Sequence, residues 1–383
     1  MNFSGHNPSK LMEVGVSVFA RIGALATQHN AVNLSQGFPD FPSYEKMINL
    51  VHENMLKGHN QYLPMSGLFS LREVISDKIK SQSKIYYNPE TEITITAGAT
   101  QAIYTAITSV IEENDEVIVF EPAYDSYIPA IKLNGGIPIY IELNYPDYTI
   151  DWDYIKKRVN NRTKMIIINT PNNPTGKIMS YEDFKELEKI VSNSNILILS
   201  DEVYEHIIFD NKKHYSICDF PELASRSFVI YSFGKMFHTT GWKLGYCLAP
   251  EILTTQFRKI HQFIVFTCNT PIQYALSEFM KEKTYLEIGK MFQEKRNYFL
   301  DNIKQSKFKF IPTEGTYFQI LDYSAISLEN DEEYAKQLII ESGLATIPIS
   351  SFYHTPNNNT LLRVCFAKTD NTLDKAIEII CKI

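Results

Sequence analysis

Residues 228–248 read FVIYSFGKMFHTTGWKLGYCL, in which two short apolar runs flank a loop of mostly small residues. Such runs are typical of strands buried on both faces of a sheet. Elsewhere along the chain, longer stretches of helical pattern alternate with such runs, and ATQAIYTAITSVI (99–111) fits a crossover helix. Alternation of this kind predicts an α/β fold with a mainly parallel sheet between helices. Four further runs precede these two along the chain: EITIT (92–96), EVIVF (116–120), MIII (165–168) and ILILS (196–200).

The C-terminal part of the chain is organised differently. A helical stretch at 284–304 precedes short apolar runs around 317–321 and 361–366, which is typical of an α+β unit. The loop-rich N-terminal segment is expected to pack with that unit. The chain has 383 residues, enough for two domains. We expect an N-terminal segment (1–45), a large domain (46–280) and a small domain (281–383).

Composition narrows the class of protein. The formal net charge of −7 argues against nucleic acid or an anionic membrane as the main partner. No run approaches the length of a membrane span, and no signal-peptide pattern is evident, so we expect a cytoplasmic protein. The cysteines are scattered without metal-ligand spacing, which predicts reduced thiols and no metal site. They are Cys218, Cys247, Cys268, Cys365 and Cys381.

Lys235 lies in the small-residue loop after the run at 228–231. Such a loop can present an amine to the crevice at the strand ends, where α/β proteins bind ligands. A lysine that forms a Schiff base needs a pKa lowered by burial or by a neighbouring cation such as Lys243. Most lysines are solvated surface groups, so Lys235 by itself does not define a site.

Three polar residues follow other predicted strands. Asp201 ends the run at 196–200 and could pair with a protonated ring nitrogen, although aspartate also fits a helix N-cap. Tyr204 lies three residues later and could reach the same ring. Asn173, within NTPNNPTG, could hold a ligand oxygen, although Asn-Pro pairs more often form tight turns.

The strand-to-helix turn TAGATQA could bind an anion. The N–H groups of Ala99 and Thr100 would open the helix and point at the anion. Ser232 and Lys243 could complete a phosphate site, and Tyr124, in EPAYDSY, could stack on a planar ring. A plain strand–helix turn and ordinary aromatic packing are the alternatives.

Arg363 interrupts the apolar run LLRVCF near the C-terminus. A guanidinium among apolar neighbours needs a partner, and its planar fork suits the α-carboxylate of an amino acid. On an alternating strand, the residue could equally face solvent.

Together these motifs resemble those of the class I/II aminotransferases, which are fold-type-I enzymes that use pyridoxal 5′-phosphate (PLP). The resemblance covers nearly the whole chain and implies a PLP-dependent transferase fold, with a mainly parallel seven-stranded sheet in the large domain. EGTYF and HQFIVF are most similar to bacterial methionine aminotransferases, a group that is itself similar to kynurenine–glutamine aminotransferases. The other motifs, in order, are NLSQGFPDF, NQYLPMSG, TAGATQA, EPAYDSY, NTPNNPTGK, LSDEVYEHI, SFGKMFHTTGWKLGY and LLRVCFAK.

The resemblance also implies residue roles. Lys235 would form the Schiff base with PLP and act as general acid and base, and Asp201 would pair with the pyridinium nitrogen. Many relatives carry arginine at the position of Lys243, and the lysine of this chain keeps the charge but lacks the bidentate fork of arginine. The remaining cofactor contacts would be Tyr204 and Asn173 at the ring hydroxyl, Tyr124 on the ring, and Ala99, Thr100, Ser232 and Lys243 at the phosphate.

The same resemblance implies a substrate site shared between subunits. The Gly37 backbone, Arg363, and Asn169 or Asn173 would receive the substrate carboxylate. Tyr62 would reach the phosphate, and Phe266 the side-chain pocket, from the other subunit of a homodimer. With Phe19, these rings make an aromatic pocket without a second arginine, which favours methionine first and then other large neutral amino acids.

The family mechanism is ping-pong transamination: a 2-oxo acid leaves while the cofactor keeps the amino group, and a second 2-oxo acid then accepts it. Two alternatives use the same scaffold, a kynurenine/glutamine aminotransferase and a cysteine-S-conjugate β-lyase. A PLP-fold regulator would need a DNA-binding domain, and the sequence shows no basic helical extension for one.

Overall fold

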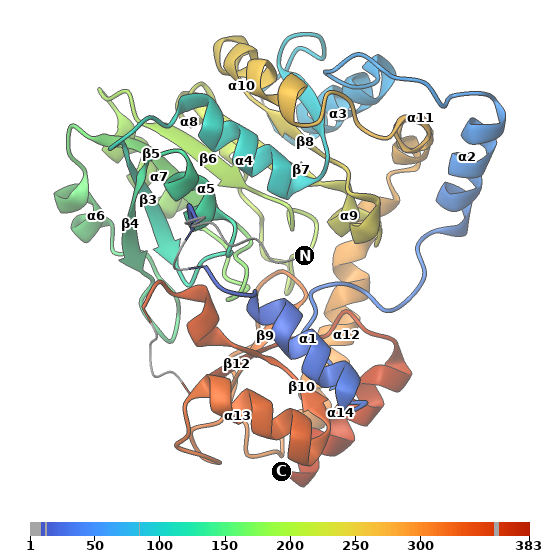
Figure 1. Cartoon of the computed structure of the whole chain (residues 1–383), viewed down its shortest axis with the longest axis vertical. Helices are drawn as coiled ribbons and strands as arrows, with labels where there is room; N and C mark the ends of the chain where they lie inside the picture. The colour runs from blue at the N-terminus through green and yellow to red at the C-terminus, as the bar shows by residue number, and fades with distance from the viewer. Residues whose placement is uncertain (1–8, 12–13, 84, 356–359) are drawn as a thin grey trace, which may run out of the picture.

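The computed structural model describes residues 9–11, 14–83, 85–355 and 360–383. Its centre is a seven-stranded sheet with the strand order β2-β8-β7-β6-β5-β3-β4 (Figure 1). Neighbouring strands are parallel except at β8, which runs antiparallel to β2 and β7. The expected mainly parallel sheet is therefore confirmed. The strands are β2 (Ile93–Thr96), β3 (Glu116–Glu121), β4 (Ile137–Glu142), β5 (Thr163–Asn169), β6 (Leu197–Asp201), β7 (Ser227–Ser232) and β8 (Gly245–Leu248).

The apolar runs of the sequence became six of these strands, and β4 is the seventh. It lies at the edge of the sheet, and most of its residues are at least partly exposed. It also contains Pro138, which an edge strand tolerates because one side of the strand needs no ladder hydrogen bond. Its run IPIYI (137–141) is apolar but was not among the predicted strands, and a proline within a run argues against a strand at the centre of a sheet.

Two layers of helices cover the sheet, with a hydrophobic core on each face. Alternate strand residues point to opposite faces, so Ile118 and Ile166 contribute to one core while Val119 and Ile167 contribute to the other. The first core includes residues of α2 (Glu45–Leu56), α3 (Phe69–Gln82), α6 (Trp152–Arg158), α7 (Tyr181–Val191), α8 (Pro221–Ala224) and α11 (Thr270–Phe279). The second includes residues of α4 (Ala99–Val110), α5 (Tyr127–Leu133) and α10 (Glu251–Ile264).

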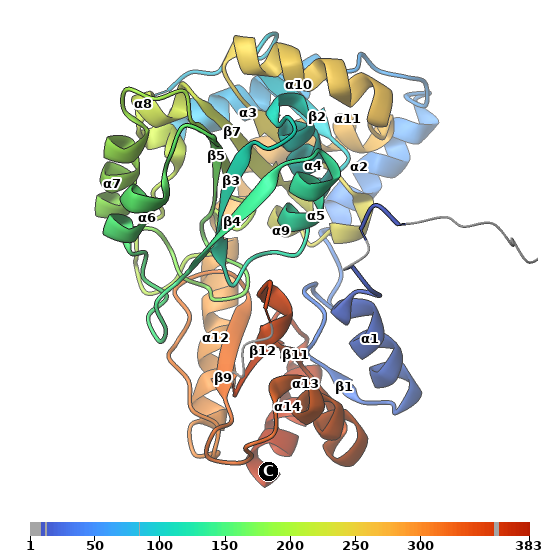
Figure 2. The ribbon, with the colours of Figure 1, turned by 60° about the vertical axis from the view of Figure 1, so that its left-hand side comes forward.

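A smaller unit with its own core lies beyond the strand ends of the large sheet (Figure 2). Its three-stranded antiparallel sheet has the order β11-β12-β9. The expected helix at 284–304 begins at Ile288, because 284–286 form a separate 3₁₀ turn. The elements are α12 (Ile288–Ile303), β9 (Phe318–Asp322), α13 (Asp331–Gln337), β10 (Leu344–Ala345), β11 (Ile347–Pro348), β12 (Leu361–Cys365) and α14 (Asp370–Lys382).

The N-terminal segment packs with this smaller unit. α1 (Val18–Gln28) contributes Ile22 and Ala26 to its core, and β1 (Val32–Asn33) pairs in parallel with β10. We therefore propose the division into 1–45, 46–280 and 281–383, of which 1–8, 12–13, 84 and 356–359 lie outside the described residues.

Two further features bear on the class of protein. Four cysteines are buried, Cys381 is exposed, and none of the five is in a disulfide within the described structure. Among the described helices, none has both the length and the apolar composition needed to cross a membrane.

Gly176 joins the large and small units by a close backbone contact. Its carbonyl accepts a hydrogen bond from the Gly315 N–H at 2.9 Å. Its φ is +70°, and a Cβ there would lie 1.5 Å from Thr313 Oγ1 and 2.8 Å from the Gly315 carbonyl oxygen. Only glycine therefore fits this junction without displacing the small unit.

We expect Gly176→Ala to lower the free energy of unfolding by about 2 kcal/mol more than Gly343→Ala does. Gly343 has a matching φ of +72° but open space around its Cβ position, so the control reports backbone strain alone. Chemical denaturation of both variants measures the difference. Equal losses would show that the junction relaxes freely.

Candidate active site

A cavity of about 220 Å³ lies at the carboxyl ends of the strands of the large sheet, between these strand ends and the small unit. In α/β sheets this edge is the usual ligand site. The structure brings thirteen of the fifteen predicted site residues to its wall, all except Tyr62 and Phe266. They are Phe19, Gly37, Ala99, Thr100, Tyr124, Asn169, Asn173, Asp201, Tyr204, Ser232, Lys235, Lys243 and Arg363.

Lys235 lies in α9 (Phe233–Met236), a single helical turn directly after β7 rather than the expected loop. Its Nζ donates to the Tyr317 hydroxyl at 2.8 Å and to the Gly37 carbonyl oxygen at 3.3 Å. Burial lowers the pKa of Lys235 to about 8, and the charges of Arg363 and Lys243 act in the same direction. The interpretation of Lys235 as a solvated surface group is therefore wrong. Near neutral pH, a fraction of the protein molecules carry this amine in its neutral form.

Asp201 is the last residue of β6, and its carboxylate is buried. Tyr127 donates its hydroxyl to Asp201 Oδ2 at 2.6 Å, and the Val203 N–H donates to Oδ1 at 3.4 Å. Burial raises the pKa of Asp201 to about 6, although the Tyr127 hydrogen bond acts in the opposite sense. A turn rather than a helix follows β6, so the N-cap interpretation is wrong.

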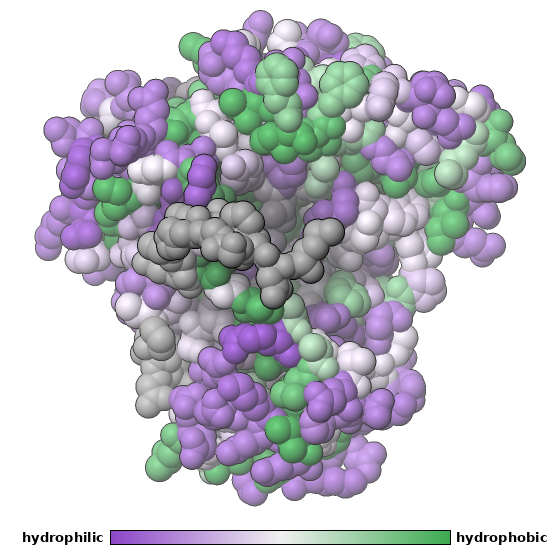
Figure 3. Space-filling view, viewed as in Figure 1, coloured by the Kyte–Doolittle hydropathy of each residue, from purple (hydrophilic) through white to green (hydrophobic). Residues whose placement is uncertain are grey.

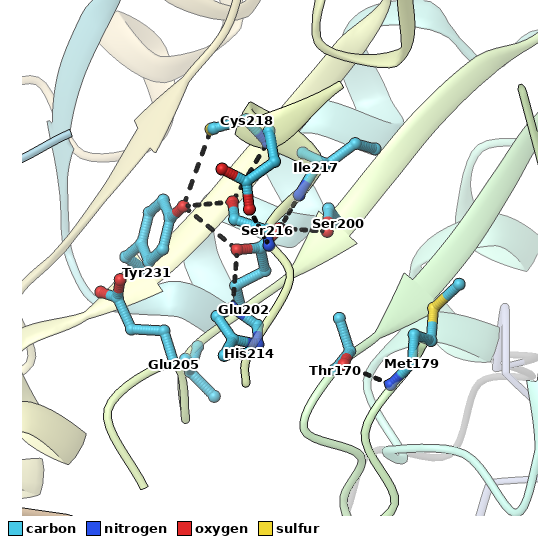
Figure 4. Close-up of polar contacts among 12 residues, drawn as sticks. Thr170, Met179, Ser200, Glu202, Glu205, His214, Ser216, Ile217, Cys218 and Tyr231 are labelled. Carbon is cyan, nitrogen blue, oxygen red and sulfur yellow. Dashed lines mark hydrogen bonds and ion pairs between the residues drawn. The ribbon is translucent and has the colours of Figure 1, made fainter. Parts of the chain in front are cut away.

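A buried polar network fixes the end of β6 from the opposite face of the sheet (Figure 4). Glu202 accepts hydrogen bonds from Ser200 Oγ at 2.8 Å, the Ile217 N–H at 3.0 Å and the Tyr231 hydroxyl at 3.2 Å. Burial alone would raise the pKa of Glu202, but its contact with His214 and the hydrogen bond from the Ile217 N–H lower it. Glu202 therefore stays ionised and anchors the backbone that carries Asp201.

The N-terminus of α4 forms an anion site. Gly98 precedes the helix with a φ of +81°, and a Cβ added at this glycine would lie 3.4 Å from Lys243 Nζ. The first N–H groups of a helix lack intrahelical partners, here those of Ala99 and Thr100. The Thr100 hydroxyl lies 3.1 Å from the Tyr124 hydroxyl. A lysine ammonium beside free helix N–H groups suits a phosphate.

Arg363, on β12, is only 1% exposed, so the solvent-facing alternative is wrong. Its Nη1 donates to Asn173 Oδ1 at 2.8 Å and its Nη2 to the Ser35 carbonyl oxygen at 3.0 Å. Burial lowers the pKa of Arg363 to about 10, which leaves it charged. Its buried Nε has no partner among the described residues. An orphaned donor of this kind is costly, so the site favours an anionic ligand.

Aromatic rings enclose the same guanidinium. Its carbon lies 4.0 Å from the ring centroid of Phe318, 5.0 Å from that of Phe352 and 5.3 Å from that of Phe19. Phe19 and Phe352 also contact each other edge-on. The guanidinium of Arg363 is therefore surrounded by apolar rings.

Two predicted site residues lie elsewhere. Tyr62 is 79% exposed and Phe266 52% exposed, and their rings contact each other edge-on with centroids 5.2 Å apart. Figure 3 shows apolar side chains along the outer edge formed by α2, which carries the exposed Ile48, Met55 and Leu56. Within this chain, neither residue reaches the cavity.

Sequence reasoning missed Tyr127 and Tyr317 as contacts of Asp201 and Lys235. Both lie inside motifs that were recognised, EPAYDSY and EGTYF. The available signal was their place beside predicted site residues, but a buried tyrosine in an apolar context normally indicates packing. Among the described residues, no group of three or more His, Cys, Asp or Glu is placed to hold a metal ion.

Comparison with known proteins extends over the whole fold. Residues 29–380 match the family model for aminotransferases of class I and II. The methionine aminotransferase of Escherichia coli is 41% identical, over 97% of this chain and 96% of that protein. A kynurenine–oxoglutarate transaminase of Dictyostelium discoideum is 33% identical, over 98% and 96%. The solved structure of E. coli YbdL, described as a methionine aminotransferase, has a TM-score of 0.96 at 40% identity and covers 99% of this chain and 100% of that one.

We expect Asp201→Asn to stabilise the ligand-free protein in a pH-dependent way. Because the pKa of about 6 in the folded state exceeds the ordinary 3.8, the folded protein pays an increasing cost as the pH rises from about 4 to 6. The substitution should raise the free energy of unfolding at pH 8 by about 1–3 kcal/mol, and the gain should vanish near pH 4. Denaturation at both pH values measures it.

The matched control is Asp301→Asn, at an exposed position of α12. It should change stability little at either pH. A gain for Asp201→Asn that is the same at pH 4 and pH 8 would contradict a buried, destabilising charge.

Proposed function

Because the chain belongs to the class I and II aminotransferases, we propose that it transfers the amino group of a large neutral amino acid, methionine first, to a 2-oxo acid with PLP as its cofactor. The observation that carries the proposal is the cavity where Lys235, Asp201 and Arg363 converge. An amine, a buried carboxylate and a buried guanidinium supply the three contacts that such a reaction needs.

The residues of the cavity fit PLP. Its phosphate matches the α4 N-terminus with Lys243 and Ser232, and its ring nitrogen matches Asp201, whose buried carboxylate contacts only neutral donors in the described structure. Tyr124 would face the ring, and Tyr204 and Asn173 its hydroxyl. Once bound to the substrate's nitrogen in place of Lys235, PLP would draw away the electron pair that the substrate's α-carbon keeps after losing its proton.

Arg363 would bind the substrate's α-carboxylate, together with Asn169 or Asn173 and the Gly37 backbone. Its unpartnered Nε and its charge support this role. Lys235 would accept the α-proton at Nζ, since its lowered pKa keeps part of the amine neutral. Amino acid and 2-oxo acid would share the one carboxylate site, so the first product must leave before the second substrate binds, which is a ping-pong order.

The aromatic wall formed by Phe19 and Phe318 supports a large neutral side chain. Apolar pockets of this kind separate similar substrates weakly, at about 1–3 kcal/mol per methylene. The E. coli relative is named for methionine, and the relative from D. discoideum is named for kynurenine. Kynurenine is therefore the second candidate donor.

We also propose a homodimer whose subunits complete each other's sites. The exposed rings of Tyr62 and Phe266 and the apolar edge of α2 support an interface there. Tyr62 would then reach the phosphate, and Phe266 the side-chain pocket, of the partner subunit. Four buried, unpaired cysteines agree with a cytoplasmic location, where thiols stay reduced.

A donor panel with one fixed 2-oxo acid tests the substrate proposal. We expect the highest kcat/KM for methionine, values within about 200-fold for phenylalanine and kynurenine, and a much lower value for aspartate. Lys235→Ala should lose turnover. A preference for aspartate would contradict the proposed pocket. Normal turnover by Lys235→Ala would contradict the proposed role of the amine. Faster release of pyruvate from a cysteine S-conjugate without any 2-oxo acid would favour a β-lyase.

Subunit mixing tests the shared site. Lys235→Ala and Tyr62→Ala proteins, each impaired alone, should regain activity after dissociation and reassociation, because one site of every mixed dimer carries neither substitution. Random reassociation of equal amounts would restore about a quarter of the wild-type sites. Lys235→Ala mixed with Asp201→Ala should regain nothing, since both residues belong to one subunit's site. No recovery in the first mixture would show that Tyr62 does not act across the interface.

A further inference from the structure

The hydroxyl of Tyr317 joins two parts of the cavity that come from distant regions of the chain. It lies 2.8 Å from Lys235 Nζ and 2.7 Å from the Gly37 carbonyl oxygen. Lys235 Nζ also lies 3.3 Å from that carbonyl. Lysine amine, phenol and carbonyl therefore form a closed triangle, with Tyr317 contributed by the small unit.

Hydrogen-bond chemistry fixes the direction of two of these contacts. A backbone carbonyl only accepts, so Tyr317 donates its single proton to Gly37. The Tyr317 oxygen must then accept from Lys235. A neutral amine has two N–H bonds and one lone pair, and this triangle occupies the two N–H bonds. The lone pair is left unblocked, and it is the part of the amine that can receive a proton.

Packing holds the Tyr317 hydroxyl in place. The residue is fully buried, and its ring contacts Tyr204, Phe292 and Phe318 at centroid distances of 5.2, 5.5 and 4.9 Å. Phe318 also packs against Gly37, where a Cβ would lie 2.7 Å from its ring. Gly37 and Tyr317 therefore move little relative to each other.

We propose that Tyr317 is a positioning residue that holds the free amine of Lys235 by its N–H bonds, so that the nitrogen lone pair faces the substrate. This inference rests on the proposed function, in which Lys235 receives the α-proton. It gives the small unit a part in orienting the base, besides the proposed carboxylate contact of Arg363.

Tyr317→Phe removes the hydroxyl and keeps the ring. Tyr334→Phe is the matched control, because Tyr334 is a buried tyrosine of the same unit whose hydroxyl has no partner among the described residues. In the cofactor-free proteins, the pH dependence of Lys235 acylation by a small amine reagent, followed by mass spectrometry, reports how the amine is held. Loss of the acceptor should move the midpoint to lower pH by about half a unit or more in Tyr317→Phe only.

In the holoenzyme, a single turnover of methionine should slow on the order of tenfold in Tyr317→Phe, because the amine is no longer held in one orientation toward the α-proton. The α-deuterium isotope effect on this turnover should become larger. The KM for methionine and the visible absorbance of the bound cofactor should stay unchanged. Tyr334→Phe should behave as the wild type in every measurement. An unchanged turnover and isotope effect in Tyr317→Phe would overturn the proposal.

Failure of the proposed function and failure of the Tyr317 contact give different results. A wild-type protein that binds PLP but transaminates nothing would remove the proposed function, while the acylation midpoint would still decide the Tyr317 contact. If Tyr317→Phe does not fold, 3-fluorotyrosine at position 317 keeps the shape and weakens the oxygen as an acceptor. It should move the midpoint in the same direction by a smaller amount, and no movement would overturn the contact.

Discussion

The buried carboxylate of Asp201 is the constraint on which the rest of the site depends. A carboxylate taken out of water is costly unless donors or a cation compensate for the loss of hydration. Here Tyr127 and the Val203 N–H compensate only in part, since the pKa remains raised to about 6. The fold tolerates this cost because the Glu202 network fixes the end of β6 from the other face. A bound cationic ring would remove the remaining cost, so the ligand completes the electrostatics of the fold.

Charge balance at the cavity explains what kind of molecule it suits. Lys235, Lys243 and Arg363 line the cavity together with one carboxylate, that of Asp201. The excess of positive charge favours ligands that carry anionic groups. Those charges stand at separate places, Lys243 beside the α4 N-terminus and Arg363 among the rings of the small unit. The separation suits a phosphate at one end and a carboxylate at the other, with reactive atoms between them.

The sequence predicted the parts of this arrangement that depend on local order. Strands buried on both faces leave continuous apolar runs, and Asp201 and Lys235 were recognised because each directly follows such a run. The edge strand β4 was missed although IPIYI (137–141) is also an apolar run, and Pro138 within it is atypical of a central strand. Tyr127 and Tyr317 were missed for another reason: their hydroxyls acquire roles only where distant segments meet, as when Tyr317 meets Gly37 across 280 positions. Nor could the single chain reveal where Tyr62 and Phe266 act, since they lie outside its own cavity.

The small unit carries both Arg363, which we propose binds the substrate carboxylate, and Tyr317, the hydrogen-bond partner of Lys235. Arg363 of β12 pairs with Ile320 of β9, and Tyr317 immediately precedes β9. The antiparallel register therefore sets the separation between the guanidinium and the Tyr317 hydroxyl. Because Tyr317 already lies 2.8 Å from Lys235 Nζ in the described structure, its contact with the lysine does not wait for a substrate to bind. The proposed carboxylate contact and the orientation of the base therefore depend on the same strand pairing, and a shift in the register of β9 against β12 would displace both groups.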